Sequence, residues 1–326
     1  MQTLLPLLAR GAVLSPFKRP RSDAAFPRDR LVLSGVRIDL ARLAAYERAC
    51  GFPTGADALP LTYPHVLGFP LAMRIMASRA FPLPLLGLVH TSIEVTRLRE
   101  PATTGEYELA VHVEGLTPHR RGTEATVVTG ARVDGSLVWE SRSTYLARHR
   151  TTADARTPAD ARTPADARTP ADARTAADAR TPADARTPAD ARTSAHAHTS
   201  ADARTVAHVP SAGPKPLPVV AEWRLAGDVG RRYAAVSGDR NPIHLHPLTA
   251  RLFGFPRAIA HGMWTVARCL AEQPADASVQ LRAEFKSPVL LPGTVTYAAD
   301  GGRFELRGGE RVHLTGELRE HRANSA

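Results

Sequence analysis

Apolar and polar residues alternate in two separate stretches of this chain, as they do in β-strands that have one buried face. In the first stretch residues 106–113 alternate in this way, and residues 123–133 and 137–146 flank an Asp-Gly pair, which is typical of a hairpin turn. In the second stretch the alternation runs through residues 279–286. Further short strands are predicted after it, at 295–298, 304–306 and 312–318. The pattern therefore predicts two runs of antiparallel strands.

Helical spacing of apolar residues precedes each run of strands. A helix is predicted over 70–76 before the first run, with a proline at its start, and another over 259–270 before the second. Shorter helices are predicted at 40–46 and at 248–253. Both halves thus show a helix-bearing segment followed by antiparallel strands, which is an α+β arrangement. Pairing of two such halves could extend one sheet across both and bury strand edges.

A hexapeptide repeat separates the two halves. It begins near Thr151 and degrades toward Thr205, and residues 157–162 form one clean copy, TPADAR. The recurring proline interrupts any long helix, and no large apolar residue occurs before Val206, so the repeat cannot bury a core. This composition favours a disordered linker over a solenoid or binding array. The predicted divisions are an N-terminal arm, a first domain, the linker, a second domain and a tail: 1–30, 31–150, 151–216, 217–320 and 321–326.

The chain is basic, with a formal net charge of +10. Eight copies of the repeat each balance one Asp against one Arg, so the excess lies in the flanking parts. A basic surface attracts polyanions, but the sequence has no zinc finger, phosphate-binding glycine loop or basic run with interleaved aromatics, and we predict no nucleic-acid partner. A phosphorylated carrier such as coenzyme A would suit the same charge. Arg282 and Lys286 could meet its phosphates, although such strand residues are usually only solvated.

The cysteines and the N-terminal residues indicate the cellular compartment of the protein. Cys50 and Cys269 show no CxxC or Cys/His metal spacing, which is typical of a reducing compartment. The first apolar run is broken by Pro6 and Arg10 and is too short for a membrane span. We therefore expect a cytoplasmic protein without a membrane span, with a mitochondrial transit peptide as the alternative.

The stretch 233–263 carries the candidate chemistry. Asp239 and His244 flank Asn241 and Pro242. Because proline fixes its own φ and keeps the preceding residue out of the α region, the loop between the carboxylate and the imidazole is stiff. Such a pair can position one water molecule between its two groups. That arrangement suits the addition of water to a carbon–carbon double bond, or its removal.

Gly262 lies at the start of the predicted helix 259–270, where free N–H groups beside a glycine make an oxyanion site. Other interpretations of these residues stay open. Asp239 could be only a turn or cap residue, and His244 an ordinary loop histidine. Ser237 as a nucleophile lacks the surrounding G-x-S-x-G elbow. A metal site formed by Asp239, His244 and His246 matches no zinc signature.

Several residues of this stretch stand at fixed spacing: Tyr233, Ser237, Gly238, Asp239, Asn241, Pro242, Ile243, His244 and Ala250. This set resembles the signature of the MaoC-like, (R)-specific enoyl-CoA hydratase family. Residues 260–263, Ala-His-Gly-Met, are similar to the start of that family's central helix. The resemblance implies a tandem, or double, hotdog of class α+β, in which each half is an antiparallel sheet wrapped around a central helix.

The resemblance also implies an activity, the reversible hydration of trans-2-enoyl thioesters to (R)-3-hydroxyacyl thioesters in lipid metabolism. Asp239 and His244 would be the catalytic pair that activates a single water. Gly262 would hold the thioester oxygen, Asn241 would support the loop and the water, and Ser237 is grouped with these substrate-binding residues. No metal or redox cofactor is implied, and the substrate would be carried on coenzyme A or acyl carrier protein. A non-catalytic acyl-thioester binding protein and a thioesterase remain alternatives on the same fold.

The first half resembles the degenerate N-terminal hotdog of two-domain family members, through residues 59–66 and 81–90. It has no Asp-x-Asn-Pro-x-His, so we expect no second active site there, and the resemblance implies a part in shaping the acyl-chain tunnel. We interpret His65 and His90 as structural. The two halves are expected to pair within the chain, with a homodimer as a further option.

Overall fold

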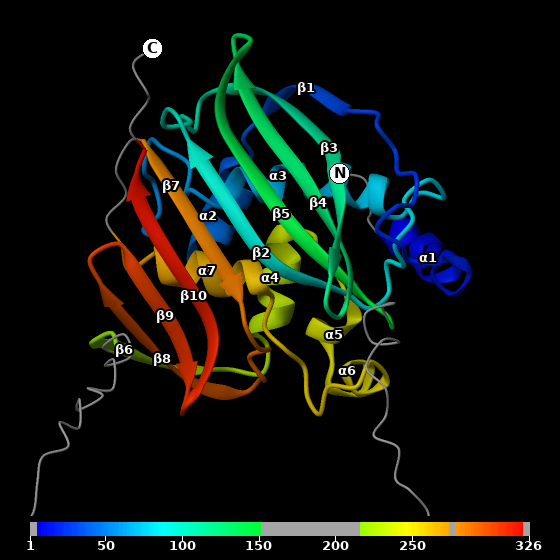
Figure 1. The fold of residues 1–326 in the computed structure, drawn as a ribbon. Coiled ribbons are helices and arrows are strands. Elements are labelled where there is room, and N and C mark those ends of the chain that lie inside the picture. The colour runs from blue at the N-terminus through cyan, green and yellow to red at the C-terminus, as the bar shows by residue number, and fades with distance from the viewer. Residues whose placement is uncertain (1–4, 151–215, 274–277, 322–326) are drawn as a thin grey trace, which may run out of the picture. The chain divides into compact units, whose positions relative to one another are not determined.

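The computed structural model describes residues 5–150, 216–273 and 278–321. Within these ranges the strands form one antiparallel sheet in the order β1-β3-β4-β5-β2-β7-β10-β9-β8-β6 (Figure 1). The strands of the first half are β1 (Leu31–Arg37), β2 (Leu88–Arg97), β3 (Glu106–His119), β4 (Gly122–Val133) and β5 (Ser136–Arg148). Those of the second half are β6 (Val219–Leu225), β7 (Val279–Phe285), β8 (Gly293–Asp300), β9 (Arg303–Gly308) and β10 (Arg311–Glu320).

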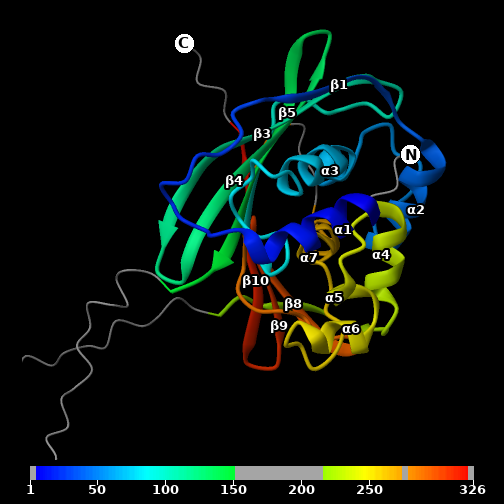
Figure 2. The same cartoon turned by 90° about the vertical axis from the view of Figure 1, so that its right-hand side faces the viewer.

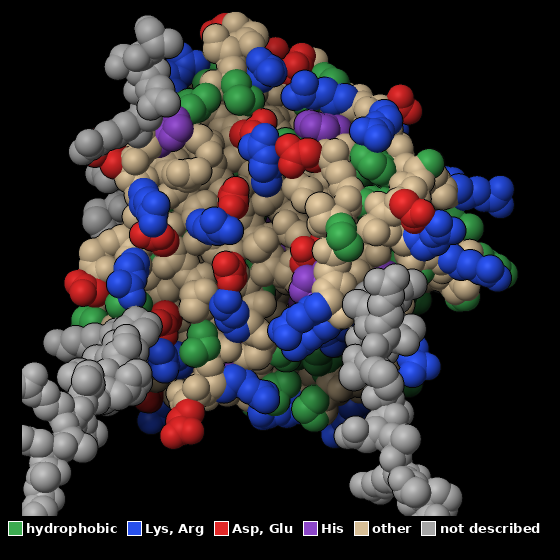
Figure 3. All heavy atoms as spheres, viewed as in Figure 1, with side chains coloured by type: hydrophobic (Ala, Val, Ile, Leu, Met, Phe, Trp, Pro, Cys, Tyr) green, Lys and Arg blue, Asp and Glu red, His purple; other side chains and the backbone are tan. Residues whose placement is uncertain are grey.

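The helices cover one face of this sheet (Figure 2). They are α1 (Leu5–Leu14), the short 3-10 helix η1 (Ser15–Phe17), α2 (Leu40–Cys50), α3 (Tyr63–Met76), α4 (Val229–Ser237), α5 (Pro242–Leu245), α6 (Pro247–Leu252) and α7 (Gly262–Leu270). On the opposite face, acidic and basic side chains are interspersed over the strands (Figure 3). The expected α+β class, with antiparallel strands and helices on one side, is confirmed. No helix among the described residues is long and apolar enough to cross a membrane.

The two halves meet where β2 pairs with β7. This antiparallel pairing extends from Ser92 opposite Glu284 to Arg97 opposite Val279, so the sheet is continuous from one half to the other. Neither β2 nor β7 is left as an open edge, because β2 also pairs with β5 and β7 with β10.

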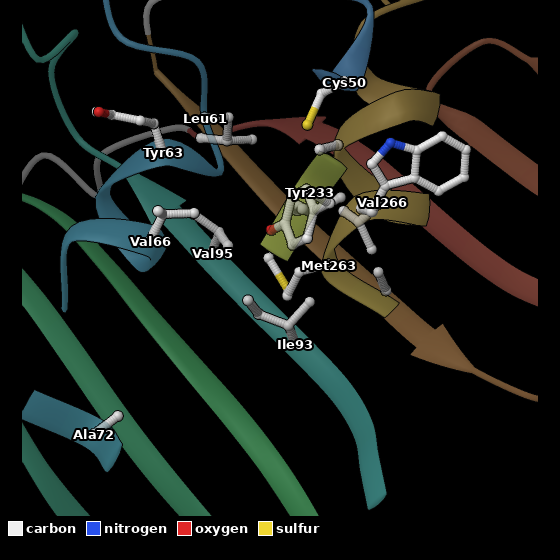
Figure 4. Packing of buried hydrophobic residues seen from close by; sticks show 14 of the residues in the cluster. Cys50, Leu61, Tyr63, Val66, Ala72, Ile93, Val95, Tyr233, Met263 and Val266 are labelled. Carbon is white, nitrogen blue, oxygen red and sulfur yellow. The ribbon is translucent and has the colours of Figure 1, made fainter. Parts of the chain in front are cut away.

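One hydrophobic core runs through both halves. Ile93 on β2 and Met263 on α7 point toward each other, with Tyr233 of α4 beside them (Figure 4). Ile93 and Val266 are completely buried, and burial of each such side chain contributes about 1.5–3 kcal/mol to folding. The packing therefore joins the start of α7, where the candidate chemistry lies, to the first half.

Several elements differ from the predicted ones. The helix predicted at 40–46 continues to Cys50. The Asp39 side chain caps its start, and Gly51, at φ 85°, ends it. The helix predicted over 259–270 begins only at Gly262, because Ile259 forms a β-bridge with Leu290. The helix α4 and the strands β1, β2 and β6 were not predicted. The repeat interpreted as a linker lies outside the described residues, at 151–215, and remains a prediction.

Candidate active site

The loop between α4 and α5 presents Asp239. Gly238 ends α4 in the left-handed region, at φ 83°, a conformation that glycine adopts without strain. The Asp239 amide donates a hydrogen bond to Ser237 Oγ at 3.2 Å, and the Asn241 amide donates one to Asp239 Oδ1 at 3.1 Å. The turn interpretation of Asp239 is thus correct for one carboxylate oxygen. The other oxygen, Oδ2, has no role in that turn.

The imidazole of His244 is held by its Nδ1 atom. Asn241 caps α5 through its side-chain oxygen, which accepts a hydrogen bond from the Ile243 amide at 3.4 Å. His244 Nδ1 lies 2.8 Å from the carbonyl oxygen of Ile259. Because a carbonyl can only accept, Nδ1 carries the ring proton and Nε2 keeps its lone pair in the neutral imidazole. Burial lowers the pKa of His244 below the usual 6.5, although Asp239 acts in the opposite direction.

His261 joins this pair. Its ring stacks on that of His244, with the ring centroids 3.7 Å apart. Its Nε2 donates to the backbone carbonyl of Asp239 at 3.0 Å and lies 3.8 Å from Oδ2 of the same residue. Burial, and secondly the neighbouring His244, lower the pKa of His261 well below 6.5. One side-chain ligand atom from each of the three residues lies within 4.8 Å of the others, so the structure brings together the predicted pair and a third group that the sequence analysis had placed only in the family's helix start.

The backbone N–H of Gly262 lies beside this cluster and has no hydrogen-bond partner within its helix, because Gly262 is the first residue of α7. A Cβ atom at this position would come within 2.8 Å of the Phe285 ring, so a larger residue here would force that ring to move. The amide therefore lies one residue from His261, where it could hold the oxygen of a thioester carbonyl.

The first half fixes both helices of the site through α2. Arg42 Nε donates to the carbonyl of Val236, near the end of α4, at 2.9 Å. Trp264 Nε1 on α7 donates to the carbonyl of Ala49 at 2.8 Å. The loop that carries Asp239 and the helix start that carries Gly262 are thus both anchored to a helix that contributes none of the three clustered side chains.

Other candidate residues lie apart from the reacting groups. Ser237 is buried and its hydroxyl supports the Asp239 backbone. His246 is exposed and caps α6 by accepting from the Leu248 amide, so the metal site considered with His246 is not formed. Arg282 lies 3.5 Å from Glu94, and Lys286 pairs with Glu284. Both basic side chains are exposed.

The packing of α4 on α5 yields one test of how His244 is positioned. A Cβ atom at Gly230 would lie 2.0 Å from the carbonyl oxygen of His244. Gly230→Ala must therefore displace α5, and we expect at least a tenfold loss of turnover with a loss of about 1–3 kcal/mol in stability, measured by steady-state kinetics and thermal unfolding. Gly227→Ala is the matched control, because its Cβ would meet Pro292 at an ordinary 3.7 Å. Normal turnover in folded Gly230→Ala protein would contradict the positioning role.

Known proteins share sequence and fold with this chain. Residues 215–315 match the family described as MaoC like domain. The chain is 32% identical over 285 residues to 3-hydroxyacyl-thioester dehydratase X of Mycobacterium tuberculosis, covering 86% of this chain and 84% of that protein. The crystal structure of HtdX from the same organism matches with a TM-score of 0.66 and 29% identity, over 90% of this chain and all (100%) of that one. A MaoC-like dehydratase from Phytophthora capsici shares the fold at 17% identity, with a TM-score of 0.60 over 94% of this chain and 99% of that one.

Proposed function

This chain belongs to the MaoC-like dehydratase family, with a double hotdog fold, and from that premise we propose that it reversibly hydrates trans-2-enoyl thioesters to (R)-3-hydroxyacyl thioesters. It is a hydro-lyase of acyl thioesters, as its family membership indicates. The observation that supports the residue assignment is the pairing of a fixed carboxylate, Asp239, with a neutral imidazole, His244, whose Nε2 bears a lone pair.

The proposed step uses one water molecule. In hydration, His244 Nε2 accepts a proton from the water as the water oxygen bonds to C3, while Asp239 Oδ2 accepts a hydrogen bond from the O–H that remains and so orients the water. The proton is then delivered from His244 to C2. In dehydration the same steps run backwards: C2 loses its proton, the C3–O bond breaks, and the hydroxyl leaves as water. The Gly262 amide stabilises the enolate-like thioester oxygen in both directions.

We propose that this step needs no metal or redox cofactor and that coenzyme A or acyl carrier protein carries the substrate. The spacing of Asp239, His244 and His261 also suits one metal ion, which makes a metal-activated water the second candidate. His244 Nδ1 and His261 Nε2 are bonded to carbonyl groups, so a metal ion would have to bind the other nitrogen of each ring, His244 Nε2 and His261 Nδ1. We further propose a cytoplasmic enzyme in which the paired halves form the functional unit.

The test is the loss of the enoyl-thioester absorbance of crotonyl-CoA after addition of the full-length protein, repeated with C8 to C12 enoyl-CoA and with a chelator present. We expect hydration that the chelator leaves unchanged. Loss of activity with chelator, restored by one divalent metal, would favour the metal-activated water. Release of free thiol would instead indicate a thioesterase. Tight binding of these thioesters without turnover, with the corresponding acyl carrier protein substrates also inert, would indicate a scaffold.

A further inference from the structure

A group of polar rings lies in the interior of the first half. His90 on β2 is the direct cross-strand partner of Tyr145 on β5, and their rings stack with centroids 4.6 Å apart. His65, on α3, stacks on His90 at a centroid distance of 6.2 Å. Polar rings from α3, β2 and β5 thus lie together on the inner face of the sheet.

Phe285 connects this group of rings to the candidate active site. The ring of Phe285 lies 4.8 Å from that of His90 and also lies against Gly262. The carboxylate of Asp239 acts electrostatically on His65 and on Tyr145, raising the pKa of each, although burial is the larger influence on both. His90 is thus separated from Gly262 of the candidate active site by the single ring of Phe285.

Both histidines have a buried ring nitrogen without a partner. Among the residues that the structure describes, His65 Nδ1 and His90 Nε2 are enclosed and make no hydrogen bond. Burial lowers the pKa of His65 to about 4 and that of His90 to about 3, so both rings are neutral at pH 7. An unsatisfied buried polar atom destabilises a protein, and a phenyl ring of similar shape would avoid that cost. A purely structural role thus leaves the choice of histidine unexplained.

We propose that His65 and His90 form a subsite that binds a neutral hydrogen-bonding group of the thioester substrate, such as a hydroxyl, carbonyl or amide. This inference rests on the proposed function, because it assumes that the thioester reacts at Asp239 and His244. Two uncharged rings offer hydrogen bonds but no net charge, so they suit neither a carboxylate nor a phosphate. The group has two sources, a polar substituent on the acyl chain or an amide of the pantetheine arm.

The variants that test the subsite are His65→Phe and His90→Phe, with His65→Gln and His90→Gln as partial restorations. We expect each Phe variant to keep or raise the thermal unfolding midpoint, to raise KM on the order of tenfold per lost hydrogen bond, and to change kcat less. The Gln variants should recover part of the KM. His112→Phe is the matched control, because His112 Nδ1 is also buried without a partner among the described residues but lies among Arg30, Glu114, Glu140 and Arg142.

Substrates separate the two sources. Crotonyl-CoA is compared with the S-ethyl crotonyl thioester, which lacks the pantetheine amides, and with enoyl-CoA that carries a hydroxyl or keto group further along the chain. A KM effect with crotonyl-CoA that disappears with the S-ethyl thioester identifies a pantetheine amide. An effect confined to the substituted chains identifies an acyl group.

Two outcomes would overturn the inference. In the first, the Phe variants match His112→Phe with every substrate. In the second, they lose as much with the S-ethyl thioester as with the others, so that neither a pantetheine amide nor a substituent of the acyl chain is the group bound. If His65→Phe or His90→Phe does not fold, the Gln variant is compared with wild type on the same substrates; because it should recover only part of the KM, a wild-type KM with every substrate would overturn the inference. Wild-type protein that hydrates none of these thioesters would instead contradict the proposed function itself.

Discussion

Asp239→Asn will lower kcat on the order of 10³-fold while the thermal unfolding midpoint stays close to that of the wild type. Asparagine keeps an oxygen that can accept the Asn241 amide, so the turn that shapes the loop survives. It replaces the second oxygen with an NH2 group, which donates where the proposed water needs an acceptor. The measurement is kcat with crotonyl-CoA beside a thermal melt of each protein.

The matched control for this change is Asp228→Asn. Asp228 precedes α4 and pairs with Arg232 at 3.4 Å on the surface, so its substitution removes the same charge without touching the loop of Asp239. We expect near-normal kcat from Asp228→Asn. A rate within about threefold of wild type in Asp239→Asn would remove this carboxylate from the mechanism and leave the turn as its only role.

His244→Gln will lower kcat/KM by about 10²- to 10⁴-fold and remove the acidic limb of the pH profile. In the wild type, protonation of Nε2 abolishes the lone pair, so kcat/KM falls as the pH drops through the pKa of His244. Because burial lowers that pKa, the fall should lie below pH 6.5. Glutamine can still donate to the carbonyl of Ile259 but cannot carry the proton to C2. Initial rates between about pH 4.5 and 8 provide the measurement.

The corresponding control is His246→Gln. His246 is exposed and lies on the same short segment, where it caps α6. Its variant should keep the wild-type profile. An acidic limb that persists unchanged in His244→Gln would show that another group carries the proton, and His261 is the nearest alternative because its ring stacks on that of His244.

The parts of the site that sequence predicted are local. Asp239, Asn241 and His244 lie within one short loop, where proline restriction and capping act between neighbours. His261 comes later in the chain and reaches His244 only because the Ile259 amide bonds the carbonyl of Ile243 and the Ala260 amide bonds that of Val289. No periodicity in the sequence carries such long-range bonds, so only the structure shows that His261 contacts His244.

For the strands, too, the sequence predicted the regularly alternating ones and missed an irregular one. Residues 106–113 and 279–286 alternate regularly, and the strands β3 and β7 were predicted there. In β2 a bulge between His90 and Ser92 breaks the alternation, and this strand, which joins the two halves, was missed. The place of His90 in the proposed subsite depends on that bulge and on pairing with Tyr145, which local pattern alone does not encode.

The pairing of β2 with β7 has an evolutionary consequence. In the proposed mechanism proton transfer uses residues of the second half, whereas α2 of the first half anchors them and β2 continues the sheet. With the proposed subsite, substitutions on the inner face of the first half would change which thioesters are accepted without altering the acid–base chemistry. Under this proposal the two halves have separate tasks, so that substrate choice could change in the first half while the catalytic residues of the second half stay the same.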